Sequence, residues 1–148
     1  MKIWNIGYPR VGHKNRWGIA LREWEGSETN SQALLEKATE VLQERWKSQH
    51  DLGVDSIPLN DFSFWDPVLE TAWLFNLFNP KGIEGKDWLS SQFCLAGALQ
   101  QKSWFRSGYQ YCQPEWDGKT ALSLNRQKLD WELQNQKKVP YLFHVTLL

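Results

Sequence analysis

The sequence predicts an α/β fold, and more narrowly a partial (β/α)8 TIM-type barrel with about four parallel strands and crossover helices. Short apolar segments alternate with longer segments whose apolar residues recur at helical spacing, an order that favours a parallel sheet. Four strands are half of an eight-stranded barrel. The last segment is an apolar strand without a polar tail, so we expect one truncated domain over residues 1–148.

Four segments have the composition of strands. They are rich in apolar and β-branched or aromatic residues, they are flanked by turn-forming residues, and they cover residues 3–8, 54–59, 109–112 and 139–148. Helices are predicted between them.

The first two helices are amphipathic. Residues 14–25 place their apolar side chains on one helical face. A second helix begins near Thr29, which has capping-box spacing to Gln32, and Gly53 is a typical helix stop.

Three further helices follow. Asp66 is a capping acid, and Pro67 suits the first helical position, so a helix begins there and ends before Asn79 and its following proline. Residues 88–106 and 122–138 are also predicted to be helical.

Composition excludes several classes of protein. Lys and Arg number 17 and Asp and Glu number 17, so no net charge attracts nucleic acid or an anionic membrane. Cys94 and Cys112 form no disulfide framework or Cys-x-x-Cys motif. The chain lacks a signal-peptide core and the ~20 apolar residues of a membrane span. We expect a cytoplasmic protein whose partners include neither nucleic acid nor membrane.

Ten tryptophans are many for a chain of this length. Most lie at helical spacing beside Leu and Ala, which favours burial in the core. The alternative is an exposed aromatic platform for sugars or bases.

A basic segment follows the first predicted strand. Ligands of parallel α/β proteins bind at the C-terminal ends of strands, so Arg10, Lys14 and Arg16 are candidate substrate-binding residues. A phosphate or a polyglutamate tail would pair with these cations. The alternative is a solvated basic turn, because neither familiar spacing of a phosphate-binding glycine loop occurs here.

Two acids flank the loop after the second predicted strand. Asp61 and Asp66 could act together in acid–base chemistry. Asp66 has the position of a helix cap, and we favour that role. Asp61 lies at the strand end and is therefore the better candidate for ligand binding.

The sequence predicts no catalytic or metal-ligating residues. His13, His50 and His144 are scattered without metal-binding spacing, and we expect them to be structural. Cys94 and Cys112 are predicted to be ordinary buried cysteines. We expect no cofactor in this chain.

The motifs of the first half resemble a known family. Residues 7–12, Gly-Tyr-Pro-Arg-Val-Gly, resemble the opening segment of cobalamin-independent methionine synthases. Residues 46–49 resemble the end of that family's tryptophan-containing second helix. Residues 52–63 resemble its next strand and Asp-Phe-Ser loop, and residues 64–69 continue in register.

The second half carries a weaker resemblance to the same family. Residues 104–105, 109–111 and 114–115 look like a later strand of its N-terminal barrel. Residues 139–146 look like a degraded form of the next barrel strand. The resemblance therefore covers nearly the whole chain, in order.

The resemblance implies a full-length enzyme of two β/α barrels that transfers a methyl group from methyltetrahydrofolate polyglutamate to homocysteine in methionine biosynthesis. The N-terminal barrel helps to hold the folate, and the C-terminal barrel binds homocysteine and a catalytic zinc. None of those zinc-ligand motifs is present in this sequence. We therefore expect a folate-side domain that is inactive alone.

The sequence departs from the family at basic positions. The family's Arg-x-x-Lys after the first strand falls at Asn15 and Gly18, and a family lysine falls at Ser103. Arg10 and Asp61 do match. The implied binding of methyltetrahydrofolate polyglutamate is accordingly weak.

The alternative hypothesis is a non-catalytic assembly module. Half a barrel exposes sheet edges and apolar surface. A second copy or a partner chain could complete it.

Overall fold

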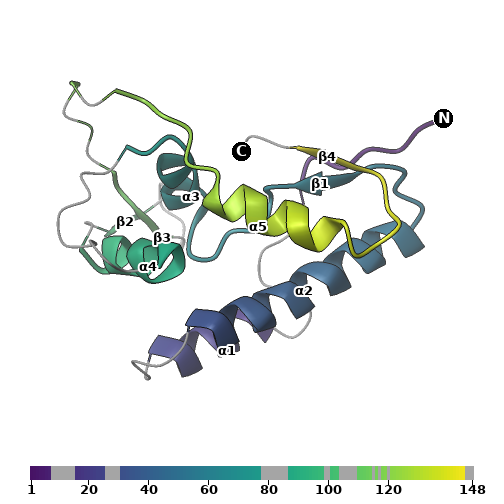
Figure 1. The fold of residues 1–148 in the computed structure, drawn as a ribbon, viewed down its shortest axis with the longest axis horizontal. Coiled ribbons are helices and arrows are strands. Elements are labelled where there is room, and N and C mark those ends of the chain that lie inside the picture. The colour runs from purple at the N-terminus through teal and green to yellow at the C-terminus, as the bar shows by residue number, and fades with distance from the viewer. Residues whose placement is uncertain are drawn as a thin grey trace. The chain divides into compact units, whose positions relative to one another are not determined.

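The computed structural model describes residues 1–7, 16–25, 31–77, 87–98, 101–103, 110–114, 116, 118–119 and 121–145. The helices and strands of these residues follow the order α1 (Arg16–Glu25), α2 (Ser31–Asp51), β1 (Ile57–Leu59), α3 (Pro67–Leu74), α4 (Trp88–Ala98), β2 (Gln101–Ser103), β3 (Gln110–Cys112), α5 (Gln127–Gln136) and β4 (Phe143–Val145) (Figure 1). They form two compact units. Unit 1 contains the described residues up to Phe62 and from Leu129, and unit 2 those of Ser63–Lys128.

Unit 1 is built on parallel strands. β1 pairs with β4 in parallel, with Ile57 opposite Phe143, and Trp4 forms an isolated parallel bridge with Ser56 (Figure 1). Two parallel strands need a crossover connection between them. Helices α1 and α2 lie between Trp4 and β1 in the chain. The prediction of an α/β fold with parallel strands is therefore confirmed for unit 1.

Helix α2 contributes more buried apolar residues to unit 1 than any other described element. Its buried residues recur at helical spacing and are Leu34, Ala38, Val41, Leu42, Arg45, Trp46 and Gln49. The Trp46 ring meets the Phe143 ring of β4 edge-on, with 4.8 Å between centroids. The predicted stop at Gly53 is confirmed, because Gly53 has a φ of 85° just beyond the helix. The predicted cap Thr29 lies outside the described residues.

Helix α1 packs against α2 along its length (Figure 1). It buries Trp17, whose side chain meets the Phe62 ring at 5.2 Å. This agrees with the predicted apolar face of residues 14–25.

Unit 2 has its own core and its own strands. The buried cluster is Leu69, Ala72, Trp73, Leu95, Ala96 and Cys112. Strands β2 and β3 pair antiparallel, with Lys102 opposite Tyr111. They form a sheet separate from that of β1 and β4.

Two element predictions are wrong in this unit. The strand predicted at 109–112 does not pair in parallel, because β3 takes β2 as an antiparallel partner. The helix predicted over 88–106 ends at Ala98, and residues 101–103 become that partner strand. A strand seven residues away costs less loop-closure entropy than a distant one, and an antiparallel pair needs no crossover helix.

The prediction of the last helix needs shortening. The last helix is α5, Gln127–Gln136, and not 122–138. Leu122 and Leu124 are spaced by two residues, which does not match a helical face, and both are 59% exposed. No helix in the part of the chain described here is both long and apolar enough to cross a membrane.

The tryptophans divide between core and surface. Trp17, Trp46 and Trp73 are buried, whereas Trp4 and Trp116 are 69% and 58% exposed. The remaining described tryptophans are half-buried. The prediction that most tryptophans are buried therefore holds only in part.

Candidate functional site

Asp61 lies just beyond the C-terminal end of β1, where ligands of parallel α/β proteins bind. Its carboxylate accepts a hydrogen bond from the Arg45 guanidinium of α2, with 3.1 Å between Nη2 and Oδ2. Both side chains are almost fully buried, at 2% and 3% exposed. The Arg45 guanidinium also lies 5.3 Å from the centre of the Phe62 ring. A buried acid is thus fixed and electrically balanced at the strand end.

Arg45 is a site residue that the sequence analysis missed. It falls in the apolar stripe of α2, four residues after Val41 and beside Trp46. A cation inside such a stripe is expected to be buried and therefore to need an acidic partner. The position of Arg45 in the apolar stripe could therefore have indicated a buried ion pair from the sequence alone.

The turn that carries Asp61 is held by helix α5. Asn60 adopts a left-handed conformation with φ of 65°, and its backbone N–H donates to the Glu132 carboxylate at 2.5 Å. Glu132 is completely buried. A hydrogen bond to a buried carboxylate stabilises the strained turn, so the direction of Asp61 is determined by two helices.

The segment predicted as the first strand comes close to Asp61, although among its described residues only Trp4 pairs, in an isolated bridge. A side chain added at Gly7 would meet the Asp61 Cβ atom at 3.8 Å. Gly7, which precedes the basic segment, and Asp61, which follows β1, are therefore adjacent. This agrees with the expectation that ligand-binding segments lie together at the C-terminal ends of parallel strands. Arg10 and Lys14, the next two candidates, lie outside the described residues.

Arg16 does not join Asp61. It begins α1, and its guanidinium contacts two carboxylates of α2, Glu44 at 2.7 Å and Glu40 at 3.5 Å. Arg16 is 40% exposed, so the pairs are screened by solvent. Its role in ligand binding stays a prediction, and part of its charge is already balanced by these acids.

Asp66 is a helix cap, as predicted. Its Oδ1 accepts from the Leu69 N–H at 2.8 Å, with Pro67 in the first helical position. Its other oxygen, Oδ2, accepts from the Cys112 N–H of β3 at 3.1 Å. Asp66 therefore ties α3 to β3 within unit 2 and is committed to structure.

The histidines with described placement make ring contacts. His50 stacks on Tyr141 at 4.5 Å, and His144 stacks on Trp4 at 5.7 Å. The His144 Nδ1 also lies 2.9 Å from the Ser56 hydroxyl. His13 lies outside the described residues.

The two cysteines differ. Cys112 is buried, as predicted, and burial raises the pKa of its thiol to about 12. Cys94 is exposed, so its predicted burial is wrong. It occupies the solvent side of α4, where the apolar pattern of the helix is nearly continuous and does not distinguish the two faces.

The described side chains do not fit a metal centre. Among them, no three His, Cys, Asp or Glu residues lie close enough to hold an ion.

Comparison with known proteins places the chain in a family. The profile described as cobalamin-independent synthase, N-terminal domain, matches residues 2–148. The chain belongs to this family. The resemblance based on the motifs of residues 7–12 and 52–63 is therefore confirmed.

The relatives are much longer proteins. The 5-methyltetrahydropteroyltriglutamate–homocysteine methyltransferase of Campylobacter jejuni subsp. doylei is 32% identical over 150 residues, which cover 94% of this chain and 20% of that protein. Proteins of the same name from Xylella fastidiosa and Listeria monocytogenes serotype 4b are 36% and 38% identical, over 76% and 75% of this chain and 16% of each protein. This chain spans about a fifth of the length of the first relative.

Proposed function

We propose that the chain acts as the folate-side, N-terminal part of a cobalamin-independent methionine synthase. In this role it binds methyltetrahydrofolate polyglutamate weakly and does not transfer the methyl group alone. The observation that carries the proposal is the family match over residues 2–148, together with relatives named for a pteroyltriglutamate and homocysteine. We propose that residues 1–148 form one partial N-terminal barrel domain of this family.

The geometry around Asp61 supports the binding of an anionic ligand. Arg45 balances the charge of Asp61, so this acid does not repel an anion that approaches the strand end. Gly7 is in contact range of Asp61, and the segment with Arg10 and Lys14 follows Gly7 directly. These cations, with Arg16, are proposed to pair with the glutamate tail.

The methyl transfer itself is assigned to residues outside this chain. In the proposed full-length enzyme, zinc supplies a thiolate from homocysteine by lowering the pKa of the bound thiol. The side chains described here do not fit that metal. The role left to this chain is to bind and orient the folate.

Titration calorimetry with methyltetrahydrofolate triglutamate tests the proposal. We expect weak binding that falls with added salt, because the contacts are ionic. An Arg10→Gln/Lys14→Gln variant should lose most of the heat. Lys47→Gln is the matched control, because Lys47 is exposed and pairs with Asp51 near the end of α2, so its loss should not alter binding.

Two results would contradict the proposal. The absence of heat at millimolar ligand would remove the binding role. Formation of methionine from homocysteine by the purified chain would remove the claim that it is inactive alone.

A second candidate function is a non-catalytic assembly module, completed by a second copy or a partner chain. The supporting observation is the exposure of large apolar side chains in unit 1, with Trp4, Ile6 and Leu142 at 69%, 83% and 62%. Such surface favours association. Sedimentation velocity tests it: a monomer over the whole accessible concentration range would exclude self-pairing.

A further inference from the structure

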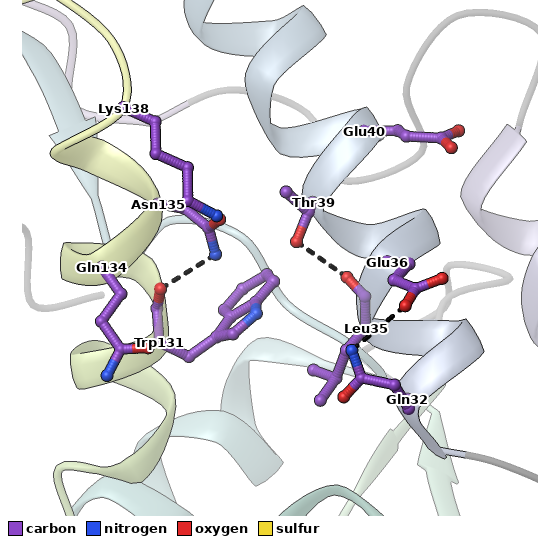
Figure 2. A pocket seen from close by; sticks show the side chains of 9 residues that line it. All are labelled: Gln32, Leu35, Glu36, Thr39, Glu40, Trp131, Gln134, Asn135 and Lys138. Atoms are coloured by element: carbon purple, nitrogen blue, oxygen red, sulfur yellow. Dashed lines mark hydrogen bonds between the residues drawn. The ribbon is translucent and has the colours of Figure 1, made fainter.

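A groove in unit 1 lies between α2 and α5 on the surface of the two helices (Figure 2). Its volume is about 560 Å³. This is within the range of small-molecule sites, about 300–1,000 Å³. All of its lining residues belong to unit 1, and the candidate residues Arg16 and Asp61 are not among them.

The groove has one aromatic surface. Figure 2 shows the Trp131 indole reaching from α5 into the space beside Leu35 of α2. Trp131 is half-buried. The centre of its ring lies 6.4 Å from the centre of the Phe62 ring. Packing against the core restricts the indole, so its accessible part is a preformed apolar platform.

The polar side chains of the groove are arranged by short-range hydrogen bonds. The Asn135 amide donates to the Trp131 carbonyl at 3.0 Å and accepts from Lys138 Nζ at 2.9 Å. On the opposite wall, the Gln32 amide donates to Glu36 at 3.2 Å. Amide groups both donate and accept hydrogen bonds, and the Thr39 hydroxyl, which donates to the Leu35 carbonyl at 2.8 Å, adds an acceptor. This mixture matches the hydroxyl groups of a polyol.

The charges of the groove do not select an ion. Glu40 is already paired with Lys37 at 2.6 Å and with Arg16 at 3.5 Å. Glu36 and Lys138 have opposite charges and stand on opposite walls. Neither an anion nor a cation would find a concentrated opposite charge here, whereas a neutral ligand avoids the cost of losing ionic hydration.

We propose that the groove between α2 and α5 binds a neutral mono- or disaccharide, with one face of the sugar ring on Trp131 and its hydroxyls on Gln134 and Glu36. An apolar ring face and equatorial hydroxyls are the two surfaces that an indole and amide side chains recognise together. The groove does not include Asp61, although its lining residue Glu40 pairs with Arg16, one of the proposed folate-binding residues.

Titration of the 15N-labelled chain with glucose and with maltose, followed by NMR, tests this proposal. We expect saturable shifts of the Trp131 indole signal and of neighbouring α2 and α5 amides, with a dissociation constant on the order of millimolar. Gln134→Ala should weaken binding about three- to tenfold, the effect of one lost hydrogen bond. Gln134 is exposed, so folding should be unaffected.

Two further variants complete the design. Gln127→Ala is the matched control, because Gln127 is an exposed glutamine of the same helix that does not line the groove. Trp131→Phe keeps an aromatic ring against Phe62 but reduces the platform, so it should also weaken binding.

Three results would overturn the proposal. The first is the absence of shifts at the highest soluble sugar concentration. The second is shifts confined to the exposed Trp4 or Trp116. The third is a stronger response of the groove signals to putrescine or to inorganic phosphate, which would show that charge and not hydroxyl recognition governs the site.

Discussion

Arg45 and Asp61 show how strongly one buried pair constrains this protein. The two side chains are at most 3% exposed, so neither charge can be hydrated by bulk water. By contrast, Arg16 carries the same guanidinium at the surface of α1 and reaches Glu44. Comparison of the two arginines separates the effect of burial from that of ion pairing.

Arg45→Met should destabilise the protein by about 3–5 kcal/mol, because it removes the cation that faces a buried carboxylate. Arg45→Met/Asp61→Leu should recover much of this loss, since neither charge of the pair remains. Urea unfolding measures both. Arg16→Met is the control and should cost about 0–1 kcal/mol. Equal losses for the two arginines would contradict the buried-pair argument.

The two cysteines should differ in reactivity. The pKa of Cys112 is raised to about 12 by burial, so the thiol stays protonated at pH 9. Cys94 is exposed on α4. Iodoacetamide should label Cys94 in the native protein and Cys112 only after unfolding in urea, which mass spectrometry of the peptides resolves.

The same shift has a consequence for stability. The folded state favours the protonated thiol of Cys112. Its contribution to the free energy of unfolding is therefore complete below the ordinary pKa of 9.0. The contribution is lost as the pH rises from 9 towards 12. Rapid native labelling of Cys112 at pH 8 would contradict the burial.

At the level of elements, two aspartates cap helices of unit 2 in different ways. Asp87 accepts from the Leu89 and Ser90 N–H groups of α4 and is exposed. Asp66 caps α3 and also accepts from the Cys112 N–H of β3. One cap therefore serves a single helix, and the other joins a helix to a strand.

Asp66→Ala should cost about 2–4 kcal/mol, the sum of a lost cap and of a buried N–H left without its acceptor. Asp87→Ala should cost about 1 kcal/mol, as an exposed cap does. Chemical unfolding of the two variants gives the comparison. If the two losses were the same, the bond from Asp66 to β3 would have no energetic importance.

At the scale of the whole molecule, unit 1 exposes apolar side chains along its parallel strands. Trp4 stacks on His144, and Leu142 lies two residues before His144, so alternation places them on one side of the sheet. Phe143 faces the opposite way and packs on Trp46. One side of the strands is thus part of a helix-covered core, and the other carries exposed apolar groups.

Leu142→Lys should weaken any self-association at least several-fold, because a charge would replace an apolar contact at the strand edge. Sedimentation velocity at matched concentrations measures the change. Leu122→Lys is the control, since Leu122 has similar exposure in unit 2. If both variants associate as the unaltered chain does, the strand edge is not the interface.

Local and periodic signals in the sequence were enough to predict α2, its stop at Gly53 and the cap at Asp66. Each depends on residues within one helical turn or on a repeated spacing, and such interactions form with little loop-closure entropy. The adjacency of Gly7 and Asp61 was predictable for a related reason. Parallel strands necessarily bring their C-terminal ends to one edge.

Only the tertiary structure decided which distant groups pair. The sequence alone determined that Asp61 follows a parallel strand, but not that Arg45 balances it or that Glu132, 72 residues from Asn60, holds its turn. It determined a strand at 110–112, but not its antiparallel partner β2. The physical reason is that burial makes an unmatched charge or backbone group costly, and the partner that relieves this cost is chosen by packing across the fold and not by spacing along the chain.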